Sequence, residues 1–203
     1  MKILVILGHP RPGSFNHAIA ETAIRTLEES GHTVCFHDLY EERFDPVLPY
    51  AEIRADGRPE PLVATHCQDL AGAGGLVIVH PNWWGGPPAI LKGWVDRVMR
   101  AGLAYELSAE GLPTGLLKAS TALVLNTSDT PAEREAEVFG DPLETVWKNC
   151  ILAYCGIGRI ARRNYGVVVT STPAERARWL ADVRSLVQDM FPQTRSRTRE
   201  AVC

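Results

Sequence analysis

The chain has 203 residues, of which 45% are hydrophobic and 22% are charged, and its formal net charge is −3. This length and composition suit one well-buried domain and argue against a globally disordered chain. The small net charge gives no electrostatic case for a nucleic-acid partner, and no apolar run approaches the roughly 20 residues that a membrane-spanning helix needs.

Apolar runs alternate with helical patterns along the chain. Strands are predicted at residues 2–7, 32–39, 75–79, 119–126 and 158–169, and helices at residues 16–30, 62–73, 87–100, 142–154 and 173–190. Four prolines between residues 44 and 61 predict an irregular excursion, and residues 111–118 read as a loop or a hairpin. Because crossovers between parallel strands need helices, the pattern predicts an α/β fold with an open parallel sheet between two helical layers.

We expect one domain over residues 1–192 and a polar C-terminal tail over residues 193–203. The five cysteines are odd in number and show no CxxC spacing, which indicates free thiols in a reducing cytoplasm and no metal site. Cys150 and Cys155 are interpreted as buried apolar residues rather than a redox pair. The basic cluster at residues 159–163 is interpreted as a solvated face.

In open α/β sheets, ligands bind beyond the carboxyl ends of the strands. The loop after the first strand, GHPRPGSFN, runs directly into a helix, whose first N–H groups and dipole favour an anion. His9 or Arg11 can add charge there, and Ser14 can add a hydroxyl donor. The alternative is that Ser14 or Asn16 only caps the helix.

The loop after the third strand, HPNWWGGPP, joins two tryptophans to two glycines and two prolines. Flat apolar side chains next to closely approachable backbone suit an aromatic ring system. The alternative is that one tryptophan belongs to the core and the other covers a helix end. The loop after the fourth strand, residues 126–130, lies at the same edge. An anion site and a ring site at one sheet edge together suit flavin mononucleotide.

These segments resemble the flavodoxin-like NAD(P)H quinone oxidoreductases, which include mammalian quinone reductase and the bacterial ancillary reductases of glutathione-gated potassium efflux. The resemblance rests on GHPRPGSFN (8–16), DLYEERFDP (38–46), HPNWWGGPPAILKGWVDRV (80–98) and GLAYE (102–106), and more weakly on residues 139–157 and the last helix. It covers most of the chain. It implies a three-layer, doubly wound, five-stranded sheet with strand order 2-1-3-4-5.

The resemblance also implies a flavoprotein that takes hydride from NAD(P)H and reduces a quinone or similar acceptor in a ping-pong reaction, and that forms a homodimer. The interface would include Tyr105 and the helix that starts near Pro87. FMN is favoured over FAD, because the long C-terminal extension of the mammalian relatives is lacking. Carried over by position, the flavin-binding residues are His9, Ser14, Phe15, Asn16, Pro81, Asn82, Trp83, Trp84, Gly85, Asn126, Thr127, Ser128 and Asp129.

Several positions depart from the family pattern. Gly85 stands where relatives often carry a bulky residue, which predicts a more open wall of the flavin pocket. Asp129 either faces the flavin edge, where it would lower the reduction potential, or points to solvent. Phe139 stands where relatives carry a histidine that assists charge transfer, and the neighbouring tyrosine is missing. Two alternatives therefore stay open: a flavin-binding regulatory protein with little turnover, and a one-electron carrier of the flavodoxin kind.

Overall fold

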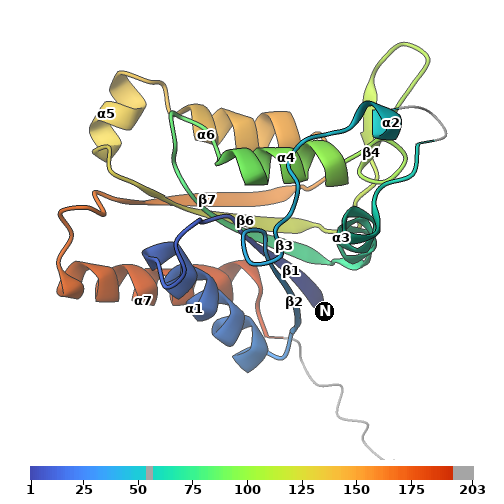
Figure 1. Ribbon diagram of the computed structural model, residues 1–203. Coiled ribbons are helices and arrows are strands. Elements are labelled where there is room, and N and C mark those ends of the chain that lie inside the picture. The colour runs from blue at the N-terminus through green and yellow to red at the C-terminus, as the bar shows by residue number, and fades with distance from the viewer. Residues whose placement is uncertain (54–56, 194–203) are drawn as a thin grey trace, which may run out of the picture.

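The computed structural model describes residues 1–53 and 57–193. At its centre lies a parallel sheet with the strand order β2-β1-β3-β6-β7 (Figure 1). The strands are β1 (Lys2–Leu7), β2 (Thr33–Asp38), β3 (Gly75–Pro81), β6 (Thr121–Ser128) and β7 (Arg159–Gly166). This order is the predicted 2-1-3-4-5, and the α/β fold class is confirmed. Of the expected tail, residues 194–203 lie outside the described part of the chain.

Helices cover both faces of the sheet (Figure 1). One layer contains α1 (Phe15–Glu29) and α7 (Pro173–Met190); the other contains α3 (Pro61–Gly72), α4 (Ala89–Val98), α6 (Pro142–Thr145) and the π-helix η1 (Val146–Leu152). Alternate residues of each strand serve the two layers, as the pleat requires. Ile3 and Val5 of β1 pack with α1 and α7, whereas Leu4 and Ile6 join the core under α3 and α4.

The central strands end together. In the parallel register, Leu7 of β1 pairs with Val79 of β3, and His80 of β3 pairs with Asn126 of β6. Every residue of β3 and of β6 is buried, which explains the continuous apolar runs. The loops that follow β1, β3 and β6 therefore leave the sheet at one edge.

The connections hold small elements that the sequence pattern missed or left open. The proline-rich excursion contains α2 (Tyr50–Ile53), and residues 105–115 form a hairpin of β4 (Tyr105–Leu107) and β5 (Pro113–Gly115). A further short helix, α5 (Ala132–Glu137), follows β6. The predicted helix at residues 142–154 begins as α6 but continues as η1, a change of hydrogen-bond pattern that side-chain periodicity does not reveal.

Two sequence interpretations were wrong in part. Cys155 is buried as expected, but Cys150 is exposed on η1. In the basic cluster, the side chain of Arg162 is almost fully buried and contacts Asp141 and Glu144. Arg162 is buried because Asp141 and Glu144, which belong to another part of the chain, pack against it. A local run of basic residues does not predict such packing.

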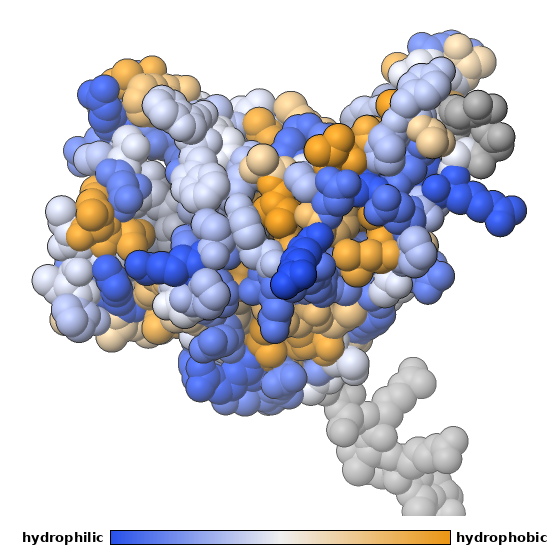
Figure 2. All heavy atoms as spheres, in the orientation of Figure 1, coloured by the Kyte–Doolittle hydropathy of each residue, from blue (hydrophilic) through white to orange (hydrophobic). Residues whose placement is uncertain are grey.

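The surface is a mixture of hydrophilic and hydrophobic side chains, with α5 and the β4–β5 hairpin projecting at opposite corners (Figures 1 and 2). Exposed large hydrophobic side chains occur on the segment around α2 and on the hairpin, namely Val47, Tyr50, Ile53, Leu107 and Leu112. Among the described residues, no helix is both long and apolar enough to cross a membrane.

Candidate flavin site

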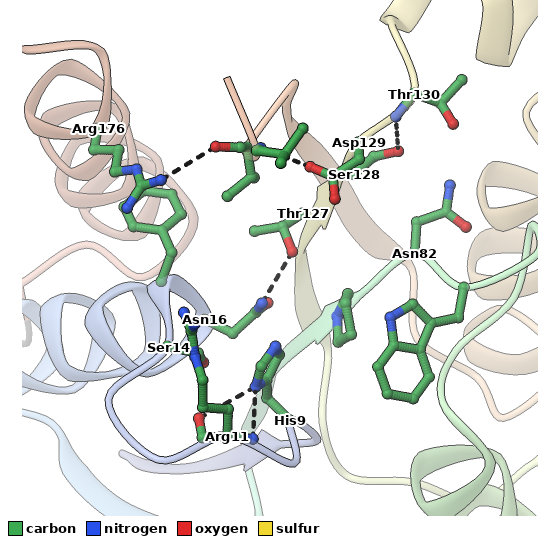
Figure 3. Close-up of a pocket in the computed structure, with 15 residues that line it drawn as sticks. His9, Arg11, Ser14, Asn16, Asn82, Thr127, Ser128, Asp129, Thr130 and Arg176 are labelled. Atoms are coloured by element: carbon green, nitrogen blue, oxygen red, sulfur yellow. Dashed lines mark hydrogen bonds between the residues drawn. The ribbon is translucent and has the colours of Figure 1, made fainter. Parts of the chain in front are cut away.

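A cavity of about 590 Å³ opens where β1, β3 and β6 end. Figure 3 shows its lining, which comes from the three loops at this edge, from the loop after β7 and from α7. Of the residues predicted from sequence, those that line it are His9, Ser14, Phe15, Asn16, Pro81, Asn82, Trp83, Thr127, Ser128 and Asp129. Side chains far apart in the chain thus meet in one place, as the strand register requires.

The loop after β1 forms the part of the cavity suited to an anion. Ser14 is the N-cap of α1, and its Oγ accepts from the His17 N–H at 3.4 Å and lies 2.8 Å from His17 Nδ1. The capping role and the position in the cavity are therefore compatible. His9 Nδ1 accepts from the Arg11 N–H at 3.1 Å. The same nitrogen lies 3.3 Å from Arg11 O, and burial lowers the pKa of His9.

Arg176 of α7 adds a positive charge to the cavity, and sequence reasoning did not predict it. Its Nη2 donates to Val168 O at 3.1 Å and its Nε donates to Ser171 Oγ at 2.8 Å. The guanidinium also lies 5.7 Å from the centre of the Phe15 ring. These contacts hold the charge near the N-terminus of α1. An arginine on the polar side of an amphipathic helix gives no local signal of such a role.

The tryptophan loop is a tight turn. The Trp83 N–H donates to Gly86 O at 2.9 Å and the Gly86 N–H donates to Trp83 O at 3.0 Å. The two residues between them both have positive φ, 56° at Trp84 and 73° at Gly85, as in a type I′ turn. Neither indole is buried: Trp83 is 42% exposed and Trp84 is fully exposed. The alternative in which one tryptophan belongs to the core is therefore wrong.

Two buried acceptors of the cavity residues lack a protein partner. Asn16 Nδ2 donates to Thr127 Oγ1 at 2.9 Å, and Asn82 Nδ2 donates to Glu135 Oε1 at 2.8 Å. Each amide uses its donor group inside the protein, whereas Asn16 Oδ1 and Asn82 Oδ1 have no hydrogen-bond partner. Buried polar atoms in native proteins are normally satisfied. A ligand with N–H and O–H donors, as a flavin has, fits these two oxygens.

Asp129 and Asn126 have specific partners in the structure. Asp129 is exposed, and its Oδ1 accepts from the Val169 N–H at 2.7 Å, which ties the loop after β6 to the loop after β7. Asn126 is buried and does not line the cavity. Its Nδ2 donates to Asn164 Oδ1, and its Oδ1 accepts from Arg162, at 2.8 and 2.9 Å.

A second cavity of about 410 Å³ adjoins the first through Asn82 and Thr130. Trp84 and Gly85 line this cavity, together with Glu135, Phe139 and Pro142. An added Cβ at Gly85 would lie 2.8 Å from Pro142 Cγ, so the proline occupies the space of the side chain that the glycine lacks. Glu135 is the buried carboxylate of this wall. Glutamates stand at 133, 135 and 137, and nothing local distinguishes the middle one.

His80 supports the tryptophan loop from below. It is fully buried, its Nε2 accepts from Trp147 Nε1 at 2.9 Å, and its Nδ1 lies 2.8 Å from Pro81 O. Burial lowers the pKa of His80 to about 4, so the ring is neutral at pH 7. The Trp147 donor requires the proton on Nδ1, which then donates to Pro81 O. His80 is therefore a structural histidine that fixes the start of the loop.

The comparison with known proteins agrees with this architecture. Residues 1–186 match the family described as having a flavodoxin-like fold. A Haemophilus influenzae protein named uncharacterized NAD(P)H oxidoreductase is 34% identical over 82% of this chain and 84% of its own length. NAD(P)H dehydrogenase [quinone] 1 of Cavia porcellus is 27% identical over 95% of this chain and 78% of its own.

Among solved structures, NAD(P)H:quinone oxidoreductase from Methanothermobacter marburgensis superposes with a TM-score of 0.80 at 26% identity. The superposition covers 93% of this chain and 96% of that one. The sequence match and the shared fold lead to the same assignment. The chain belongs to the flavodoxin-like family of NAD(P)H oxidoreductases and quinone dehydrogenases.

Proposed function

We propose that this protein is a flavin-dependent oxidoreductase that takes hydride from NAD(P)H and passes it to a quinone or a similar aromatic acceptor in a ping-pong reaction. The observation that carries the proposal is the pair of unpartnered buried acceptors, Asn16 Oδ1 and Asn82 Oδ1, beside the Trp83 turn. The names of the related proteins support the reaction class.

The residues divide into two groups by what they offer. Arg11, Arg176 and the N-terminus of α1 would hold the phosphate of the flavin. Pro81, Asn82 and Trp83 would border its ring. When bound, the flavin supplies the hydride chemistry itself, so the protein's task is to orient the reactants and exclude water. The second cavity, which Trp84 and Phe139 line, would admit first the flat nicotinamide and then the acceptor.

FMN is the proposed cofactor, with FAD as the alternative, and both NADH and NADPH are candidate donors. The proposal also includes a cytoplasmic homodimer. The exposed apolar side chains of Tyr50, Ile53 and Leu107 support a second copy of the chain as a partner, since apolar side chains that gather on one surface mark an interaction site. Light scattering on a sizing column tests the dimer.

The experiment is mass spectrometry of the cofactor released by heat, followed by anaerobic stopped-flow reduction. The expected result is FMN, which bleaches on mixing with NADH or NADPH and is reoxidised by a quinone. A yellow protein that neither nucleotide bleaches supports the one-electron carrier or the regulatory protein instead. A protein that takes up neither FMN nor FAD would overturn the proposal.

A further inference from the structure

A cluster of metal-ligating side chains lies at the β2 edge of the sheet, the edge opposite to β7. Cys35 and His37 are two residues apart on the edge strand β2, so both point to the same face. Asp69 belongs to α3, the helix next to this edge of the sheet (Figure 1). His37 Nε2 lies 3.2 Å from Asp69 Oδ2 and 3.9 Å from Cys35 Sγ. All three ligand atoms lie within 4.8 Å of one another.

This spacing is close to what a tetrahedral ion needs. Zn²⁺ binds sulfur at about 2.3 Å and nitrogen or oxygen at about 2.0–2.2 Å, so its ligand atoms lie roughly 3.3–3.8 Å apart. A thiolate, an imidazole and a carboxylate are also a ligand set that zinc prefers, with the fourth position left for water.

A chain of contacts behind His37 prepares its ring for coordination. Trp94 Nε1 donates to His66 Nδ1 at 3.0 Å, so neutral His66 carries its proton on Nε2. That nitrogen lies 2.9 Å from Glu42 Oε2, although its angles are poor for a hydrogen bond. Glu42 Oε1 in turn lies 2.7 Å from His37 Nδ1. In the metal-free protein Nε2 faces Asp69 Oδ2, and the pKa of His37 is raised because hydrogen bonds to Glu42 and Asp69 outweigh its burial. A metal ion would replace the proton on Nε2, while Glu42 keeps the proton on Nδ1.

The same contacts exclude a competing arrangement. His37, Glu42 and His66 also lie close enough to surround an ion. However, the lone pair on His66 Nδ1 is used by Trp94, and the proton on Nε2 blocks the nitrogen that would have to bind. Glu42 is instead the carboxylate that orients a ligating histidine from behind, an arrangement typical of zinc sites.

We propose that Cys35, His37 and Asp69 form a zinc-binding site at the β2 edge, separate from the flavin cavity and independent of the proposed reaction. Sequence reasoning missed it because Asp69 is 34 positions from Cys35 and no spaced motif joins them. Lys2 is the competing cation: its Nζ lies 2.6 Å from Asp69 Oδ1. Removing that charge should therefore strengthen the binding of zinc.

The test is calorimetric titration of ZnCl₂ into the untagged, full-length, reduced protein as purified, with or without flavin, after treatment with a chelator. One equivalent should bind, with a dissociation constant of about 1 µM or lower. Cys35→Ser and Asp69→Asn should each weaken binding at least tenfold, and Glu42→Gln should weaken it about tenfold through His37. Lys2→Gln should tighten it.

Two thiols outside the cluster provide matched controls. Cys67→Ser changes a half-buried thiol on the same helix as Asp69, and Cys150→Ser changes an exposed one; both should leave the affinity unchanged. With Co²⁺ in place of Zn²⁺, a thiolate-to-metal absorption band should appear in the difference spectrum and be lost in Cys35→Ser. No saturable binding, or binding that Cys35→Ser and Asp69→Asn do not weaken, would overturn the proposal.

Discussion

Asn82 Nδ2 donates to Glu135 Oε1 at 2.8 Å, across 53 positions of sequence. The buried carboxylate holds the amide group of Asn82, whose Oδ1 has no hydrogen-bond partner in the protein. Glu135 thus acts on the cavity through Asn82.

We expect Glu135→Ala to raise the dissociation constant of FMN about tenfold. Without Glu135 the Asn82 amide is no longer held in one orientation, and its hydrogen bond to the flavin would be lost, at a cost of about 1.4 kcal/mol. Glu135→Gln, whose carbonyl oxygen still accepts from Asn82, should change it less than threefold. Glu137→Ala, an exposed position on the same short helix, is the control. Fluorescence titration of the flavin measures all three. Equal effects of Glu135→Ala and Glu137→Ala would show that Glu135 does not position Asn82.

Arg176 is expected to recognise the phosphate rather than the ring. Arg176→Ala should weaken FMN binding about tenfold and leave the binding of riboflavin, which lacks the phosphate, unchanged, because a charge-assisted hydrogen bond contributes about 1.5–3 kcal/mol. Arg178→Ala, on the exposed side of α7, should affect neither ligand. Parallel titrations with FMN and riboflavin measure the ratio. If Arg176→Ala weakens both ligands alike, the arginine supports the fold of the site and not the phosphate.

Gly85 has two reasons to be glycine: its φ is 73°, and an added Cβ would meet Pro142. Gly85→Ala should therefore lower the free energy of unfolding by about 2 kcal/mol or more. Gly111 has a φ of 79° but nothing within 4 Å of an added Cβ. Gly111→Ala should cost only the backbone strain, about 1 kcal/mol. Urea unfolding of both variants separates the two costs, and equal losses would argue against the contact with Pro142.

His80 makes the fold sensitive to acid. Its pKa is about 4 in the folded protein and about 6.5 when unfolded, so the unfolded chain binds more protons between these values. The stability due to neutral His80 is complete above pH 6.5 and is lost as the pH falls toward 4, on the order of 3 kcal/mol in all. The His80→Gln variant should have a lower free energy of unfolding than the wild type at pH 7, but that free energy should fall less between pH 7 and pH 4.5. Urea unfolding at both pH values measures the difference, and parallel losses would contradict it.

The sequence by itself determined the architecture and the edge at which the cavity lies. Continuous apolar runs mark strands buried on both faces, and these alternate with amphipathic helices, so the layers follow from local periodicity. Parallel strands end together, which is why three loops separated by up to about 110 positions could be assigned to one site before any contact was known. The tryptophan turn was recognised for the same reason, since its composition is local.

Only the tertiary structure decided which polar side chains meet. Arg176 reaches the anion end from the last helix, Glu135 differs from its neighbours only by facing Asn82, and Arg162 is buried among acidic partners rather than solvated. Asp69 meets His37 because α3 packs beside the edge strand. Such pairings depend on how helices are rotated and packed against the sheet. That rotation is set by the whole core, so no short stretch of sequence carries a sign of it.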